Sequence, residues 1–209
     1  MKNNPYGKEY FEGVKSNYYK GYDSIYHRIN IFFRARAALN LIHNHRKTGK
    51  LLEIGCAYGY FTKYFSENGF KAIGIDISSY AIKIAKSKFP GLKFSIGDIQ
   101  KRTKFKNGEF DVVVALEVLE HCKKLKKVLK EIKRILKKGG ILLISVPATD
   151  LQNPTFDKDN THIWYLSLKE WKRILEKAGF KILKTKVFPK IFKKIKPNWC
   201  TVFILLKSI

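Results

Sequence analysis

Residues 51–59 read Leu-Leu-Glu-Ile-Gly-Cys-Ala-Tyr-Gly, and this stretch decides the fold of the chain. Its apolar first half predicts a buried parallel strand, which breaks at Gly55 into a glycine-spaced turn. The next stretch, 60–68, is compatible with a helix. Because a strand that turns sharply into a helix brings bare backbone and helix N–H donors close to a ligand, the sequence predicts a binding turn here.

A carboxylate follows the next apolar strand. Residues 71–75 read Lys-Ala-Ile-Gly-Ile, and Asp76 comes directly after them, seventeen residues beyond Gly59. Nucleotide-binding βαβ units hold the two ribose hydroxyls with a carboxylate at about this distance. The turn and Asp76 together therefore favour a cofactor that contains a nucleoside.

The spacing within the turn discriminates between cofactors. It reads Glu53-x-Gly55-x-Ala57-x-Gly59, whereas dinucleotide enzymes use G-x-G-x-x-G. This pattern resembles motif I of the class I S-adenosylmethionine (SAM) methyltransferases, with Ala57 where that family most often has its middle glycine. The methyl group of Ala57 slightly limits how closely the methionine end of the cofactor can approach the turn.

The resemblance covers residues 48–182, and it implies SAM as the cofactor. Asp98 follows the strand expected at 92–96, where family members hold the adenine edge with an acidic side chain. Residues 110–117 and 139–147 look like the family's fourth and fifth strands. The cofactor-binding positions that the resemblance implies are Glu53, Gly55, Cys56, Ala57, Gly59, Asp76, Ile77, Asp98, Ile99 and Glu117.

Hydrophobic periodicity predicts one α/β domain. Strands are expected near 50–55, 71–76, 92–97, 110–117, 140–146, 180–188 and 199–207, and helices near 27–46, 59–68, 79–88, 123–137 and 167–178. This alternation favours a Rossmann-like, doubly wound sheet of seven mostly parallel strands, with a C-terminal antiparallel hairpin. We divide the domain into an N-terminal helical arm or lid (1–47), a SAM-binding core (48–147) and an acceptor-side segment with the hairpin (148–209).

The segment after the fourth strand suggests the chemistry, because Glu117, Glu120 and His121 lie close together in it. His162 follows the fifth strand and is expected to fold back over the same pocket. His121 and His162 are therefore the candidate catalytic residues, with His121 as a general base. Alternatively, Glu117, Glu120, His121 and His162 are ligands of a divalent ion such as Mg²⁺, which lowers the pKa of a hydroxyl. A third interpretation is that Glu120 and His121 only cap the helix expected from Lys123.

The Glu-x-x-Glu-His motif resembles two metal-assisted groups of the family, the ubiquinone-pathway O-methyltransferases and the small-RNA terminal 2′-O-methyltransferases. The first group implies a small-molecule or lipid-like acceptor, methylated at oxygen, which is our leading hypothesis. The alternatives are an RNA 2′-O-methyltransferase and a non-catalytic SAM-binding protein. The sequence Ala115-Leu-Glu-Val after the fourth strand differs from the Asn-Pro-Pro-Tyr-like loop of enzymes that methylate exocyclic amino groups of bases.

The charge composition indicates which classes of partner the chain can bind. The formal net charge is +25, which suits a polyanionic partner, yet only seven of the 42 basic residues are arginine. A lysine-covered soluble surface is the simplest interpretation, and RNA or an anionic membrane surface are the others. The segment 186–197 mixes lysines with apolar residues, so it can contact an anionic membrane or form a hairpin turn with snorkelling lysines.

The N-terminal arm is aromatic, and Tyr18, Tyr22 and Tyr26 recur every four residues, which predicts one aromatic helical face. This arm is expected either to form a lid over the cofactor or to pack against the sheet. The chain has three cysteines without a C-x-x-C pair, no apolar run long enough to span a bilayer and no signal-peptide core at its start. We expect a soluble, cytoplasmic protein, and the sequence does not determine its oligomeric state.

Overall fold

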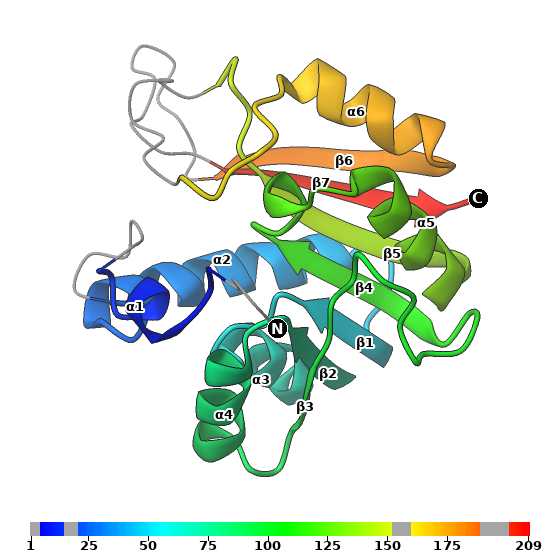
Figure 1. Cartoon of the computed structure of the whole chain (residues 1–209). Helices are drawn as coiled ribbons and strands as arrows, with labels where there is room; N and C mark the ends of the chain where they lie inside the picture. Colours follow the sequence, from blue (N-terminus) through cyan, green and yellow to red (C-terminus); the bar gives the residue numbers. More distant parts are fainter. Residues whose placement is uncertain (1–4, 15–20, 152–159, 189–200) are drawn as a thin grey trace. The chain divides into compact units, whose positions relative to one another are not determined.

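The computed structural model describes residues 5–14, 21–151, 160–188 and 201–209 (Figure 1). Its seven strands have the order β3-β2-β1-β4-β5-β7-β6, mostly parallel with antiparallel strands at the C-terminus, which confirms the predicted fold class. Two compact units divide the chain. The first unit comprises residues 1–98 and 159–161, and the second unit residues 99–158 and 162–209. The division into arm, core and acceptor-side segment stays a prediction.

The first unit contains residues 51–59, the strand and glycine-spaced turn of the predicted binding site. Its elements are α1 (Lys8–Phe11), α2 (Ile25–His43), β1 (Gly49–Ile54), α3 (Tyr60–Glu67), β2 (Phe70–Asp76), α4 (Ser79–Lys88) and β3 (Lys93–Ile96). Strand β2 pairs in parallel with both β1 and β3, so it is the central strand of this unit. Helices α3 and α4 both pack on β2 (Figure 1).

A small buried cluster fixes α4 to the strands. Cys56, Ile82, Ala85 and Phe94 pack together there, and each of them is almost fully buried. Helix α4 begins where Ser78 accepts a hydrogen bond from the backbone N–H of Ala81, a standard N-cap. The cluster therefore sets the position of the helix that follows Asp76.

Gly59 lies against this cluster, and its substitution tests the close packing of the turn. A Cβ at this position would lie 2.5 Å from Cζ of Phe94, and φ is +82°, a conformation that glycine alone adopts without strain. We expect Gly59→Ala to lower the free energy of unfolding by about 3 kcal/mol, measured by urea denaturation. Gly91→Ala is the matched control, because a Cβ there meets no atom within 4 Å. Equal stabilities of the two variants would contradict the packing argument.

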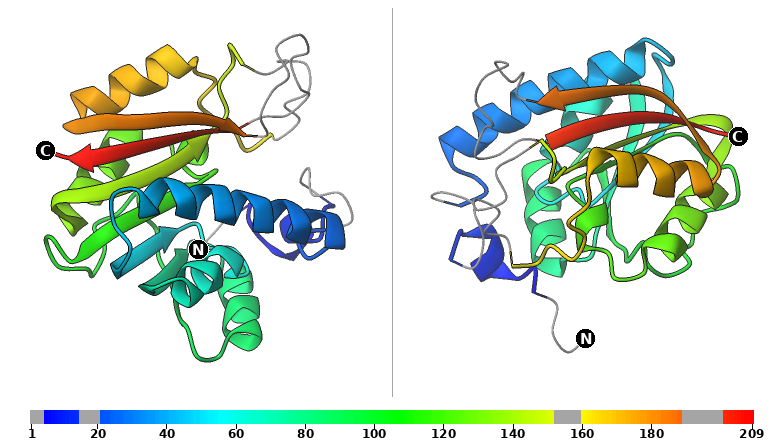
Figure 2. Two further views of the ribbon diagram at one scale, coloured as in Figure 1. Left: turned by 180° about the vertical axis from the view of Figure 1, so that it is seen from behind. Right: turned by 90° about the horizontal axis from the view of Figure 1, so that it is seen from above.

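The second unit contains the remaining strands. Its elements are β4 (Phe110–Leu116), the 3₁₀ helix η1 (Leu119–His121), α5 (Leu125–Ile135), β5 (Leu136–Val146), α6 (Leu168–Lys177), β6 (Phe180–Phe188) and β7 (Thr201–Ser208). Strands β4 and β5 are parallel, and β7 runs antiparallel to both β5 and β6. Helix α6 packs on β6, beside which β7 lies in both further views (Figure 2).

Burial explains these elements. All seven residues of β4 are buried, as expected for a strand that is covered on both faces. Helix α5 buries an apolar stripe that includes Leu125, Val128 and Ile132. Helix α6 begins with a capping box, in which Ser167 and Glu170 exchange hydrogen bonds with each other's backbone N–H.

Two local predictions were wrong. Strand β5 begins at Leu136 rather than near residue 140, because Leu136 already pairs with Phe110, and a register shift separates this pair from the rest of the ladder. The aromatic helical face does not form either. Tyr22 precedes the N-cap residue of α2, Ser24, and is buried, whereas Tyr26 is 64% exposed. Tyr18 and most of segment 186–197 lie outside the described residues.

Candidate active site

The turn between β1 and α3 has the shape that its glycines predicted. Gly55, Ala57 and Gly59 all have positive φ angles, of 72°, 46° and 82°. The N–H groups of Gly55 and Cys56 donate to the carbonyl oxygen of Ile75 at 2.8 and 3.0 Å, so the turn is fixed to the end of β2. Since Ala57 is not a glycine, its left-handed conformation costs about 1 kcal/mol, a strain typical of ligand-binding loops.

Asp76 connects the end of β2 to this turn. Its Oδ2 accepts a hydrogen bond from the N–H of Ala57 at 2.9 Å, and its Oδ1 accepts one from the N–H of Ser78 at 2.8 Å. Burial raises the pKa of this carboxyl, and the backbone hydrogen bonds oppose that rise. Each carboxylate oxygen has a second lone pair, so Asp76 can also accept hydrogen bonds from two ribose hydroxyls, the role that the sequence predicted for it.

Glu53 lies beneath the turn rather than in it. It is 2% exposed, and the hydroxyl of Thr62 donates a hydrogen bond to its Oε2. Burial raises the pKa of Glu53 to about 8, and the negative charge of Asp76 adds to the rise, whereas the Thr62 hydrogen bond opposes it. Glu53 is therefore mostly protonated at neutral pH, and its hydrogen bond joins β1 to α3.

The residues assigned to the adenine follow β2 and β3. Ile77 comes directly after Asp76 and is 36% exposed, which leaves an apolar surface for a flat ring. The N–H of Gly97 donates to the carbonyl oxygen of Asp76 at 2.9 Å. This hydrogen bond places the backbone of the next residue, the half-buried Asp98, close to the end of β2. Ile99 is buried at the start of the second unit. Their contacts with adenine stay a prediction.

The N-terminal arm packs onto the turn within the first unit. The ring of Phe11 stacks on that of Tyr58 at 5.2 Å, and Tyr22 meets Tyr58 edge-on at 5.1 Å. The Tyr60 hydroxyl donates a hydrogen bond to Asp23, which also pairs with Lys88 at 2.7 Å. The arm thus contacts Tyr58 inside the turn and Tyr60 directly after it, and a lid role stays a prediction.

In the second unit, Glu117 follows β4 in a strained conformation, with φ of 55°. Its Oε1 accepts hydrogen bonds from the hydroxyls of Ser145, at 2.7 Å, and of Thr201. Its N–H donates to the carbonyl oxygen of Ser145 at 3.0 Å. These contacts hold Glu117 against the ends of β5 and β7. Sequence reasoning missed Ser145 and Thr201, because no local motif marks either residue.

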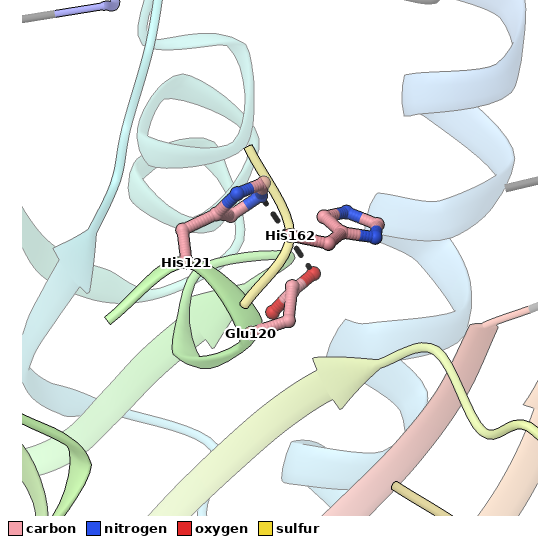
Figure 3. Close-up of side chains that lie close together, drawn as sticks. All are labelled: Glu120, His121 and His162. Atoms are coloured by element: carbon pink, nitrogen blue, oxygen red, sulfur yellow. Dashed lines mark ion pairs between the residues drawn. The ribbon is translucent and has the colours of Figure 1, made fainter. Parts of the chain in front are cut away.

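Glu120, His121 and His162 form a cluster of candidate site residues in the second unit (Figure 3). One ligand atom from each residue can be chosen so that all lie within 4.8 Å of one another. The imidazole rings of His121 and His162 lie 4.7 Å apart, and Nε2 of His121 is 4.0 Å from Oε1 of Glu120. The side chain of Glu120 is fully buried, so its negative charge would need a cationic partner such as a protonated His121. Glu117 is not part of this cluster.

Backbone hydrogen bonds bring His162 to this cluster. The N–H groups of Ile163 and Trp164 both donate to the carbonyl oxygen of Glu120, at 2.8 and 3.1 Å. The indole Nε1 of Trp164 donates to the carbonyl oxygen of Cys122 at 2.8 Å. The capping interpretation of Glu120 and His121 is wrong, because both lie in η1 and α5 begins at Leu125 without a side-chain cap.

Comparison with known proteins identifies the family. The family model described as a methyltransferase domain matches residues 24–185, more than half of the 209 residues. The protein MJ1123 of Methanocaldococcus jannaschii is 32% identical over 192 residues, which are 87% of each chain. The chain belongs to the class I SAM-dependent methyltransferases.

Two further proteins place this methyltransferase among its relatives. The ubiquinone biosynthesis O-methyltransferase of Pelagibacter ubique is 31% identical over 112 residues, which are 53% of this chain and 47% of that protein. The chain thus spans about half the length of this relative. The crystal structure of a SAM-dependent methyltransferase from Methanosarcina mazei matches with a TM-score of 0.67 and 20% identity, over 81% of this chain and 97% of the other. That likeness concerns the fold.

The donor atoms of the cluster indicate which kind of metal ion it would fit. The three residues offer one carboxylate oxygen and two imidazole nitrogens. Mg²⁺ prefers oxygen ligands, whereas Mn²⁺, Fe²⁺ and Zn²⁺ accept two histidines with one carboxylate. The cluster therefore fits a divalent transition metal better than the Mg²⁺ that the sequence suggested.

Proposed function

We propose that this methyltransferase transfers the methyl group of SAM to a hydroxyl oxygen of a small-molecule or lipid-like acceptor. The cluster of Glu120, His121 and His162 carries the proposal, because methylation of oxygen requires removal of a proton. The relative from Pelagibacter ubique is by name an O-methyltransferase of ubiquinone biosynthesis, which supports methylation at oxygen.

Methyl transfer is a direct displacement. The acceptor oxygen forms a bond to the methyl carbon, the bond from that carbon to sulfur breaks, and S-adenosylhomocysteine leaves. The hydroxyl proton passes to His121, and the buried Glu120 stabilises the resulting imidazolium. A divalent metal held by Glu120, His121 and His162 would lower the pKa of the hydroxyl instead. In both cases Asp76 and the turn orient the cofactor.

RNA 2′-O-methylation is the second candidate, because the net charge of +25 attracts a polyanion. The same cluster would then activate a ribose hydroxyl. The two candidates differ in salt dependence, since RNA binding falls steeply with salt and binding of a neutral phenol does not. A protein that binds SAM without turnover would be a non-catalytic SAM-binding protein.

The test is an acceptor screen with methyl-labelled SAM, using a catechol, a prenylated phenol and a single-stranded RNA, each with Mn²⁺, Zn²⁺, Mg²⁺ or a chelator. We expect turnover of a phenol, which His121→Ala lowers by about a hundredfold. The exposed His45→Ala is the matched control. If a metal participates, the chelator abolishes turnover, and Mn²⁺ or Zn²⁺ restores it better than Mg²⁺.

The outcomes of the screen are distinct. Full activity of His121→Ala would remove both the base and the metal role from the cluster. Turnover of RNA alone would replace the leading candidate by the second. SAM binding without turnover of any acceptor would support the non-catalytic alternative.

A further inference from the structure

Helix α2 carries large apolar side chains on a face that is exposed to solvent. The α2 apolar face consists of Ile25, Tyr26, Ile29, Phe32 and Phe33, which are 62, 64, 50, 50 and 52% exposed. Their spacing places them on one side of the helix. The other side is buried and includes Ile31, Ala38 and Ile42. A helix that covers a sheet needs only one apolar side, so the second one requires its own explanation.

The charges of α2 are of one sign. Arg28 and Arg36 are exposed, and the helix contains no aspartate or glutamate. The whole chain carries a formal net charge of +25. A partner of the α2 apolar face must therefore be apolar and must also carry negative charge.

Contacts with α3 hold the α2 apolar face in place. The ring of Phe32 meets that of Tyr64 edge-on at 6.0 Å, and Cζ of Arg28 lies 5.7 Å from the centre of the Tyr60 ring. Ser24 caps the start of α2 by accepting a hydrogen bond from the N–H of His27. The face is thus a preformed surface beside α3, the helix that follows the cofactor turn.

We propose that the α2 apolar face docks this methyltransferase on an anionic lipid bilayer. Isoleucine and phenylalanine would enter the interface between headgroups and acyl chains, while Tyr26, Arg28 and Arg36 would lie at headgroup level. Within the described residues, no helix is long and apolar enough to cross a membrane, so α2 would lie on the surface. This inference does not depend on which acceptor is methylated, or on whether methyl transfer occurs.

Two other occupants fit the face less well. A second copy would bring another chain of net charge +25 against it, with arginines facing arginines. The phosphates of RNA would pair with the arginines, and its bases could stack on Phe32 and Phe33. Ile25 and Ile29 have neither an aromatic ring nor a hydrogen-bonding group with which to bind a base. An anionic bilayer uses both the aliphatic residues and the arginines.

The test is flotation of the full chain with two kinds of vesicle, pure phosphatidylcholine and phosphatidylcholine with about one third phosphatidylglycerol. We expect binding to the anionic vesicles, which the combined substitution Ile25→Ser, Ile29→Ser and Phe33→Ser weakens by about tenfold or more. Ile209→Ser is the control, because Ile209 is 64% exposed outside the face. Titration with SAM confirms that each variant is folded and binds its cofactor.

A second pair of variants tests the charge. Arg28→Gln with Arg36→Gln should weaken anionic binding by about tenfold or more, whereas Lys126→Gln with Lys130→Gln, two exposed lysines of α5, should change it much less. Equal losses in the two pairs would mean that net charge alone binds the vesicles. Unchanged binding of the serine variant would overturn the proposal. RNA binding or dimer formation that the serine variant abolishes, without any vesicle binding, would assign the face to that partner instead.

Discussion

Asp76→Ala is expected to weaken the binding of SAM by about a thousandfold, which corresponds to about 4 kcal/mol. Hydrogen bonds to a charged group contribute about 1.5–3 kcal/mol each, and the carboxylate is expected to accept two from the ribose hydroxyls. Its present contacts with the N–H groups of Ala57 and Ser78 position it for that role. Calorimetric titration with SAM and S-adenosylhomocysteine measures the loss.

Controls separate cofactor binding from folding. Asp76→Asn keeps one acceptor oxygen and should bind SAM with intermediate affinity. Asp111→Ala removes another buried aspartate, which pairs with Lys137 at 2.9 Å, and should leave the affinity unchanged. SAM at a hundred times its dissociation constant stabilises the wild type by about 2.7 kcal/mol, and Asp76→Ala should lose most of this gain. Wild-type affinity in Asp76→Ala would contradict the ribose assignment.

Glu53→Gln is expected to remove a large pH dependence of stability. The pKa of Glu53 is about 8 in the folded chain, compared with 4.5 for an ordinary glutamate. The folded state therefore binds a proton that the unfolded state releases. The resulting stabilisation is fully present below pH 4.5 and is lost as the pH rises to about 8, by at most about 5 kcal/mol. Glutamine is neutral at every pH and still accepts the Thr62 hydrogen bond.

The measurement is the free energy of unfolding in urea at several pH values between 5 and 8. The wild type should lose stability across this range, and Glu53→Gln should lack that part of the slope. Glu131→Gln is the control with the opposite sign. Burial raises the pKa of Glu131, but hydrogen bonds from Arg134 and Thr103 outweigh it and lower the pKa to about 2. The stabilisation that the ionised Glu131 provides is lost only as the pH falls toward its pKa. Glu131→Gln should therefore keep the wild-type decrease in stability between pH 5 and 8. Parallel slopes of wild type and Glu53→Gln would refute the assignment.

Local patterns determined the fold and the cofactor turn. The apolar run 51–54, the glycines after it and Asp76 all lie within one strand-turn-helix-strand segment. Their backbone conformations depend on their own residue types, because only small residues adopt positive φ angles cheaply. Periodicity likewise predicted the elements of the sheet, since buried strands and amphipathic helices repeat every two or 3.6 residues.

The acceptor side depended on tertiary structure. Glu117 and Glu120 are three residues apart and looked equivalent in the sequence. Yet Glu117 accepts a hydrogen bond from Thr201, 84 residues away, whereas Glu120 lies in a buried 3₁₀ helix beside His162. Hydrogen bonds from Ser145 and Thr201 orient the Glu117 carboxylate, and the N–H groups of residues 163 and 164 bind the backbone carbonyl of Glu120. No local spacing in the sequence encodes these long-range contacts.

Exposure was likewise decided by packing. Helix α2 is apolar on both sides, so its sequence does not tell which side meets the protein and which meets solvent. Glu53 reads as an ordinary acidic residue before a turn, and only its burial in the folded chain raises its pKa to about 8. Residue types within residues 51–76 were sufficient to predict the strand-turn-helix and the position of Asp76 at the end of the next strand, because these features follow from short-range backbone preferences. The exposed side of α2, the neutral Glu53 and the meeting of Glu120 with His162 could be known only from the tertiary structure, because they depend on packing and hydrogen bonds between residues far apart in the sequence.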